Sequence, residues 1–507
     1  MNIRDIALNI GIACLAVMAF NYFFPVGKTS SEGPVGTFTI SKESEAQRPL
    51  NIEIDFTPTK RPQQDVITEI DTAWATLSFS TEGASLDSLE YKHPYDTKGA
   101  LFRAIFPKNE AEREERCFIV GLDEETPYFY ELKEVIDGDD TATLVYAAES
   151  STAVIKKSFI VHKAQCMIDV KLFVAPKKEG IAPRIFFVAP FLPELGQQDG
   201  LAGIVMTSGE QFEKIEHANI PEAKGWIKPL LFGLENKYFI HSLIKDSQEF
   251  VHRAFYGLKG KRRLVSVLEG PVVHDSKEWH LTFFFGPKDS DFIDAVDVRL
   301  EKTLDYAGIF APISKVMLKL LKLLYRYVHN FGLAIMVLIL CINILLLPLS
   351  LRGKKRMKEQ QEMQRKLAYI QQRYKNDPEK LNFERMELIK KHGMPGLGGC
   401  LPLLLQMPLF IAFSRVLGNS IVLYQAPMLW IHDLSASDPY YVLPFIVMVA
   451  MLLSALSVEP QQRISLIVMA FVFGAITAKL SAGLALYFAL NTLLGVVQTR
   501  IAPLIKA

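Results

Sequence analysis

Long uncharged apolar runs, separated by charged segments, dominate the last third of the chain. The first of them, Leu333–Leu351, holds 19 residues with no charge and one strongly polar side chain, Asn343. A helix of that length rises about 28 Å, close to the roughly 30 Å thickness of a bilayer's hydrocarbon core. The pattern therefore predicts a transmembrane helix. Four further runs predict spans of the same kind: Leu401–Leu417, Tyr441–Leu456, Ile464–Leu480 and Leu484–Val497.

An apolar run also occupies the N-terminus, from Ile6 to Phe24, directly behind Arg4. One interpretation is a signal peptide that is cleaved after Ala19. However, the run is longer than the apolar core of a signal peptide and continues through the proposed cut. We therefore interpret residues 1–24 as a transmembrane anchor, which brings the expected number of spans to six.

Charge asymmetry between the loops predicts the orientation of these spans. Half of the residues are hydrophobic and the net charge is only +1, but Lys and Arg are concentrated in Arg352–Lys391 and Arg500–Lys506. The positive-inside rule places both segments in the cytoplasm. Asn419–Tyr440 contains no Lys or Arg and is expected outside. An even number of spans puts both termini in the cytoplasm, so residues 25–310 are expected on the opposite side of the membrane.

The exported region is expected to be mainly β. Apolar and polar residues alternate with period two in several stretches, and Gly-containing turn signals separate them. Many short strands between residues 65 and 303 indicate a large sandwich. Residues 25–64 are rich in Ser, Pro, Gly and Lys and predict a flexible linker. The clearest alternating stretches are Ala75–Thr81, Thr141–Ala148, Ile168–Val174 and Trp279–Phe285.

Residues 304–330 predict an amphipathic helix at the membrane surface. Apolar residues recur there at helical spacing, with Lys315, Lys319, Lys322 and Arg326 between them. The aliphatic stems of lysines in this position can reach from the apolar layer to the lipid headgroups.

The charged segment 352–396 predicts an antiparallel helical hairpin. Asp377 is suited to cap a second helix that begins at Pro378. A solvated connector is one interpretation. Alternatively, the hairpin offers a basic surface to a ribosome, a targeting factor or a nascent chain. The residues expected to make such contacts are Arg356, Lys366, Arg373, Lys375 and Arg385.

Catalytic and metal-binding motifs are absent from the sequence. Cysteines and histidines are dispersed without the spacing of zinc or thiol redox sites, so we expect no enzyme activity, metal or cofactor. Cys117 and Cys166 either pair or are buried separately. The histidines of the exported region are His162, His217, His241, His252, His274 and His280.

A series of short motifs runs through the chain in a fixed order. Two lie in the exported region and the others begin at Leu304. They are Gly233–Phe239, Phe285–Lys288, Leu304–Ala307, His329–Gly332, Leu347–Leu349, Pro395–Pro402, Leu404–Phe410, Gln425–Pro427, Trp430–Ser435, Asp438–Tyr441, Glu459–Arg463, and Leu486–Tyr487 with Asn491. In this order they resemble the YidC/Oxa family of membrane protein insertases, in its Gram-negative form with a large periplasmic domain.

This resemblance implies a mixed membrane protein of the bacterial inner membrane. Five core helices would enclose a hydrophilic groove that is open to cytoplasm and lipid and closed towards the periplasm. The N-terminal anchor, the cytoplasmic hairpin and a periplasmic β-supersandwich akin to sugar mutarotases, but not catalytic, complete the expected architecture. The implied partners are nascent membrane proteins, the Sec translocon, a ribosome or targeting factor, and lipids. No small-molecule substrate is implied.

The expected groove residues are Asn343, Gln406, Arg415 and Tyr487. Counting back from Pro348, position 343 is where the family carries a groove arginine, so Asn343 is a departure. Two hypotheses for Arg415 stay open: it supplies the missing charge, or it reaches the periplasmic surface. A charge in the middle of a span costs about 2.5–3.5 kcal/mol on insertion scales. Tyr487 is either a groove residue or a core aromatic.

Overall fold

The computed structural model describes most of the chain from residue 52 onwards. The described residues are 52–54, 56, 65–92, 101–105, 116–122, 126–178, 180–190, 200–220, 224–259, 263–304, 311–375, 377–392, 401–456 and 460–501. The anchor expected at residues 1–24 lies outside this range. The strands belong to one compact unit, Gln47–Ala307 with Asn419–Val422, and the long helices to another, which includes Gly308–Gly418 and Leu423–Ala507.

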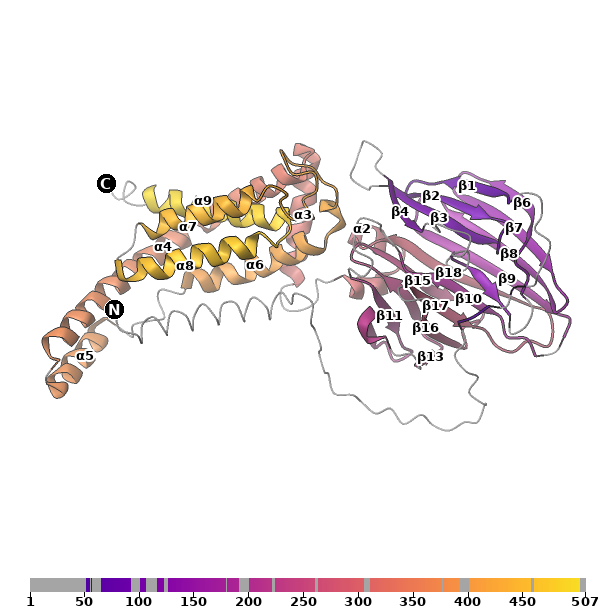
Figure 1. The fold of residues 1–507 in the computed structure, drawn as a ribbon, viewed down its shortest axis with the longest axis horizontal. Helices are drawn as coiled ribbons and strands as arrows, with labels where there is room; N and C mark the ends of the chain where they lie inside the picture. The colour runs from indigo at the N-terminus through magenta and orange to yellow at the C-terminus, as the bar shows by residue number, and fades with distance from the viewer. Residues whose placement is uncertain are drawn as a thin grey trace. The chain divides into compact units, whose positions relative to one another are not determined.

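The β unit consists of antiparallel sheets (Figure 1). A four-stranded sheet has the order β1 (Ile67–Asp71), β2 (Ala75–Ser80), β3 (Ser85–Lys92), β4 (Leu101–Ile105). A five-stranded sheet has the order β13 (Gly225–Ile227), β16 (Arg253–Lys259), β17 (Arg263–Glu269), β10 (Arg184–Val188), β5 (Ile119–Gly121). A nine-stranded sheet has the order β12 (Phe212–Glu216), β11 (Ala202–Met206), β14 (Leu231–Glu235), β15 (Phe239–Asp246), β18 (Lys277–Pro287), β9 (Met167–Pro176), β8 (Ala153–His162), β7 (Thr141–Glu149), β6 (Glu131–Asp137). Short helices α2 (Ser290–Ile293) and η3 (Val298–Thr303) follow β18, and η2 (His217–Asn219) follows β12.

Strand β18 shows how far the alternating pattern determines the core. The side chains expected on one face, Trp279 to Phe285 in steps of two, are fully buried. Phe284, on the opposite face, is also fully buried. β18 pairs with both β15 and β9 in the middle of the nine-stranded sheet. The residues of its second half, Phe283–Pro287, are buried on both faces, which period-two alternation alone does not predict.

Several buried polar groups are satisfied within the β unit. Lys157 is fully buried and donates to the carbonyl oxygens of Gly83, of Ala84 at 3.1 Å and of Phe118 at 2.9 Å. Ala84 and Phe118 both have positive φ angles, 39° and 69°. The lysine thus fixes two strained backbone segments next to β8.

Two further details bear on the expectations from the sequence. Cys117 and Cys166 are separate buried thiols, and burial raises the pKa of Cys117 to about 12. The flexible linker expected at residues 25–64 is packed in part, because Ile54 is buried and a Cβ on Gly257 would touch Ile52. The expected division into a β-sandwich and a helical C-terminal region is confirmed.

The helical unit follows the apolar runs closely. Its helices are α3 (Ala311–Val328), α4 (Phe331–Arg373), α5 (Pro378–His392), α6 (Leu401–Asn419), α7 (Val442–Ala455), α8 (Pro460–Thr477) and α9 (Ala482–Ile501), with the short η4 (Ile421–Leu423) after α6. Within the described residues, one stretch, Phe331–Pro348, is long and apolar enough to cross a membrane, and α6 to α9 contribute shorter apolar stretches. The number of six spans stays a prediction.

Helix α4 contains both the expected span Leu333–Leu351 and the first helix of the expected hairpin. It has 43 residues and continues through Pro348 and into the charged segment without a break (Figure 1). The Asn330 side chain caps its start by accepting from the Leu333 amide at 3.0 Å. α5 then begins at Pro378, and Asp377 accepts from the Lys380 amide at 3.2 Å, as its capping position predicts.

Helix α3 has the amphipathic character expected of residues 304–330. Leu318 and Leu321 are buried, whereas Val316 and Leu320 are exposed beside the lysines. Exposed apolar side chains next to lysine suit the boundary between headgroups and acyl chains.

We predict that His241 makes the β unit less stable in acid. Its ring is fully buried, with Nδ1 2.9 Å from the Val188 carbonyl, and burial lowers its pKa from 6.5 to about 3. The unfolded chain therefore binds a proton that the folded one does not, and stability is lost as the pH falls from 6.5 towards 3. Between pH 6.5 and 4.5 the loss attributable to His241 is roughly 2–3 kcal/mol, at about 1.36 kcal/mol per pH unit.

The measurement is urea unfolding of the full chain in detergent at pH 7 and pH 4.5, followed by tryptophan fluorescence. His241→Gln is expected to reduce the acid-induced loss, and His274→Gln, at an exposed position, is the matched control. An equal loss in His241→Gln and in the unmodified protein would contradict the assignment.

Candidate functional site

Helices α4 and α9 start at the same end of the helical unit, next to the loop Leu423–Tyr441, here called the outer loop. The Asn330 side chain donates to the Pro427 carbonyl at 3.0 Å, and the Gly483 amide donates to the Leu434 carbonyl at 2.8 Å. A Cβ on Gly332 would lie 2.1 Å from the Met428 sulfur, so only glycine permits this approach. These contacts place the first turns of α4 and α9 at the same level along the helix axes, next to the outer loop.

The outer loop is held by two carboxylates that bind backbone amides. Asp433 Oδ1 accepts from the amides of Gln425 at 2.9 Å and Ser435 at 2.8 Å. Asp438 accepts from the indole of Trp430 at 3.1 Å and, through its other oxygen, from the Leu443 amide at 2.7 Å. The second contact caps α7. These aspartates, which the motif pattern singles out, therefore serve the architecture of the loop.

Asn343 on α4 is paired with Asn491 on α9. The Nδ2 of Asn343 donates to the Ile339 carbonyl at 2.9 Å and to Asn491 Oδ1 at 2.8 Å. Both side chains are half-buried. Asn343 lies 12 residues, about 18 Å, from the start of α4 and five residues before the end of the Phe331–Pro348 stretch. We call these two residues the amide pair.

An aromatic cluster lies on the outer-loop side of the amide pair. Tyr487, one helical turn before Asn491, is 2% exposed and stacks on Phe413 with ring centroids 4.7 Å apart. The ring centroids of Phe410 and Phe488 lie 5.1 Å apart, and Phe473 on α8 contacts Phe488 edge to face. The cluster thus links α6, α8 and α9. The structure places Tyr487 as a core aromatic of this cluster.

Arg415 and Gln406 both lie on α6. Arg415 is four residues, about 6 Å, from the end of α6, whereas Asn343 is about 18 Å from the start of α4. The end of α6 and the start of α4 both adjoin the outer loop. Measured along the helix axes, the backbone positions of Arg415 and Asn343 therefore differ by roughly 12 Å. The side chain of Gln406 lies outside the described residues.

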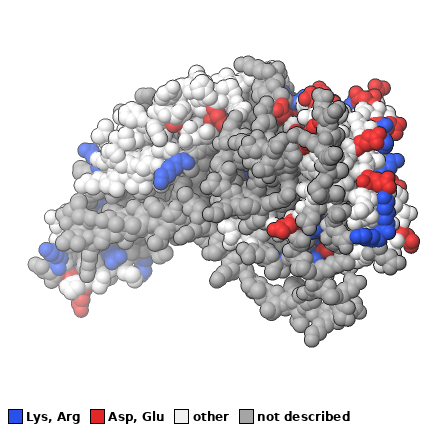
Figure 2. Space-filling view, turned by 45° about the vertical axis from the view of Figure 1, so that its right-hand side comes forward, with Lys and Arg blue, Asp and Glu red and all other residues white. Residues whose placement is uncertain are grey.

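The expected hairpin contacts lie on α4, α5 and the turn between them. Lys366, Arg373, Lys375 and Arg385 are exposed, and the side chain of Arg356 lies outside the described residues. Figure 2 shows basic side chains at this end of the helical unit, whereas the visible surface over α7 and α8 is mostly uncharged.

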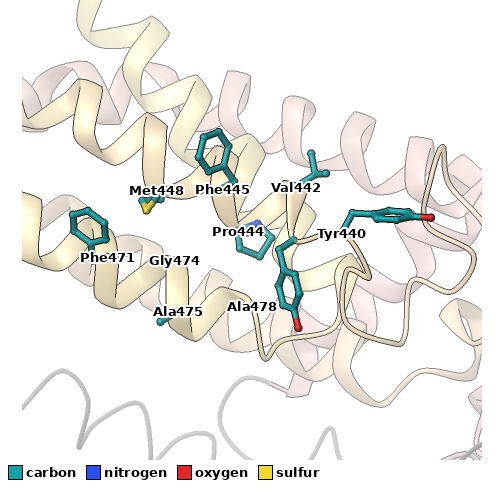
Figure 3. Close-up of a pocket in the computed structure, with 10 residues that line it drawn as sticks. Tyr440, Val442, Pro444, Phe445, Met448, Phe471, Gly474, Ala475 and Ala478 are labelled. Carbon is teal, nitrogen blue, oxygen red and sulfur yellow. The ribbon is translucent and has the colours of Figure 1, made fainter.

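An apolar groove of about 470 Å³ runs between α7 and α8 (Figure 3). Tyr440, Phe445 and Met448 line one side, and Phe471 and Gly474 line the other. The described residues of its lining include no acid, base or amide side chain, so the groove suits hydrocarbon, and Asn343 and Asn491 are not part of that lining.

The β unit brings together residues that the sequence left dispersed. His162 Nε2 lies 2.9 Å and His280 Nε2 3.3 Å from the carboxylate of Asp169. Burial acts to raise the pKa of Asp169, but hydrogen bonds from His162 and Thr282 outweigh it and lower that pKa. β8 and β9 follow one another in the chain, but His280 comes from the distant β18, so local sequence spacing does not reveal the whole cluster. Among the described residues no group of His, Cys, Asp and Glu has the arrangement of a metal site.

Comparison with known proteins covers both units. A family model of the YidC periplasmic domain matches residues 67–320, half of the chain, and one of the 60Kd inner membrane protein matches residues 323–504. The membrane protein insertase YidC of Geotalea daltonii is 28% identical over 531 residues, covering 98% of each chain. That of Helicobacter pylori is 34% identical over 307 residues, covering 59% of this chain and 54% of its own.

Among solved structures, an active YidC insertase with its first transmembrane domain resolved is 18% identical and has a TM-score of 0.38, covering 88% of this chain and 94% of its own. The two family models follow one another along the chain in the order in which the β unit precedes the helical unit. The chain belongs to the YidC family of membrane protein insertases.

Proposed function

We propose that this protein inserts integral membrane proteins into the inner membrane and helps them to fold and assemble, alone or with the Sec translocon. The family to which it belongs is one of insertases rather than enzymes. The observation that carries the proposal in this chain is the amide pair, because Asn343 lies within the stretch that is long and apolar enough to cross a membrane and meets a second amide there.

Polar groups at that depth lower the barrier to insertion. A polar client segment that enters hydrocarbon loses hydrogen bonds to water, at a cost of several kcal/mol for each unsatisfied group. A groove that holds amides and water replaces part of those bonds. The apolar helix of the client then moves sideways into lipid, driven by its own hydrophobicity, so the cycle needs no nucleotide.

The aromatic cluster and the outer loop support a groove that is closed on one side. Five packed rings and the two aspartate-bound turns lie between the amide pair and the outer end of the helices. At the other end, α4 continues into the basic hairpin. We assign the hairpin to the cytoplasm and the β unit to the periplasm, with both termini cytoplasmic, on the charge asymmetry of the loops.

The first prediction from this proposal concerns insertion itself. Depletion of the protein is expected to leave small membrane proteins with one or two spans uninserted. The measurement is protection of their exported segments from external protease, with re-expression of the full chain as the control. Unchanged protection after depletion would refute the proposed function.

A second prediction separates the two hypotheses for Arg415. Because Arg415 lies near the outer end of α6, we expect its guanidinium to reach the periplasmic surface. Arg415→Ala should then change insertion of a client with an acidic exported tail by no more than about twofold, the scale of an exposed charge. A selective loss for acidic tails, with neutral tails unaffected, would instead support compensation for Asn343.

A third prediction concerns the hairpin as a ribosome-binding surface. Lys366→Glu, Arg373→Glu and Lys375→Glu together remove exposed cations that we propose bind phosphates of ribosomal RNA. The slope of log affinity against log salt should become shallower by about one unit for each phosphate-binding cation that is replaced. Co-sedimentation of the detergent-solubilised protein with ribosomes measures this slope. Lys245→Glu, at an exposed position of the β unit, is the matched control, and identical salt slopes in the triple variant and the control would exclude ribosome binding through these residues.

A further inference from the structure

The amide pair has a fixed orientation, which determines the groups that it leaves unused. The nitrogen of Asn343 must face the Ile339 carbonyl, since the side-chain oxygen cannot donate to it. The same nitrogen contacts Asn491, so the atom of Asn491 that faces it must be the acceptor Oδ1. Neither amide can be reversed without placing two like groups against each other.

One donor and one acceptor are left over in this arrangement. Asn491 Nδ2 is buried and has no hydrogen-bond partner among the described residues. Asn343 uses its nitrogen in both contacts, and no described residue donates to its Oδ1. A buried donor without an acceptor is costly, so at membrane depth this nitrogen favours a ligand that offers an acceptor.

The chemistry of that ligand follows from the leftover groups. A peptide group offers a carbonyl acceptor and an N–H donor, as do the side-chain amides of Asn and Gln, and both complement the amide pair. A carboxylate can accept from Asn491 Nδ2, but it has no proton for Asn343 Oδ1, and the pair carries no charge to attract it. The pair therefore favours neutral polar segments over acidic ones.

We propose that Asn491, together with Asn343, binds peptide and amide groups of the polar client segment as it crosses the membrane, and that this contact selects neutral tails over acidic ones. The proposal rests on the proposed insertase function and adds to it a site residue and a substrate preference. Asn491 acts by direct contact with the client and not by moving another side chain.

The test uses the full chain in proteoliposomes and three clients with the same apolar helix. One has a neutral polar exported tail, one has the same tail with two Asp residues, and one has a tail of only a few residues. Protease protection measures insertion of each. The unmodified protein is expected to insert the neutral-tail client more efficiently than the acidic-tail client.

Asn491→Leu should reduce insertion of the neutral-tail client about three- to tenfold, the range of one buried hydrogen bond. It should leave the short-tail client unchanged, since little polar chain crosses. Asn343→Arg should reverse the preference between neutral and acidic tails. Asn491→Gln, which keeps the amide, should recover part of the loss.

Three results would overturn the proposal. Equal losses of insertion for all three clients in Asn491→Leu would indicate a structural role only. No loss of insertion of the neutral-tail client in Asn491→Leu, or no preference between neutral and acidic tails in the unmodified protein, would contradict it directly. Failure of the unmodified protein to insert any client would instead refute the proposed function. A melting temperature of Asn491→Leu equal to that of the unmodified protein shows that the variant is folded, and a short-tail client that still inserts shows the same by activity.

Discussion

The helical unit is organised by the requirement that a polar side chain in an apolar layer must find a hydrogen-bond partner. Asn343 meets this requirement twice, through its own helix and through Asn491 on α9. Such bonds between membrane helices contribute on average about 0.6 kcal/mol. The bond marks one register between α4 and α9, which also pack against each other.

Packing on the outer side of the amide pair follows from that register. Once Asn491 faces α4, Tyr487 lies one turn closer to the outer loop and contacts Phe413 on α6. The outer loop then fits over the helix ends, because Gly332 leaves room for Met428. Along the helix axes, the amide pair is thus followed by the aromatic cluster and then by the outer loop.

Much of this could be predicted from the sequence, and the exceptions have physical causes. Apolar runs located the long helices, and the cap at Asp377 was visible because capping is local. The Asn343–Asn491 contact joins residues 148 positions apart, and the Asp169 cluster joins three strands. Neither leaves a spacing signal. The motif of Leu486–Tyr487 with Asn491 contains both residues, and the groove role was predicted for Tyr487, whereas in the structure Asn491 makes the polar contact.

The continuity of α4 has a mechanical consequence. From Pro348 to Arg373 the helix rises about 38 Å, so a tilt of the hairpin by only a few degrees displaces its tip by several ångströms. Pro348 has no N–H to donate to the Ile344 carbonyl, which makes this the most easily bent point of the rod. Pro348 lies five residues after Asn343, on the hairpin side of the amide pair. Bending at Pro348 would tilt the hairpin without changing the register between α4 and α9.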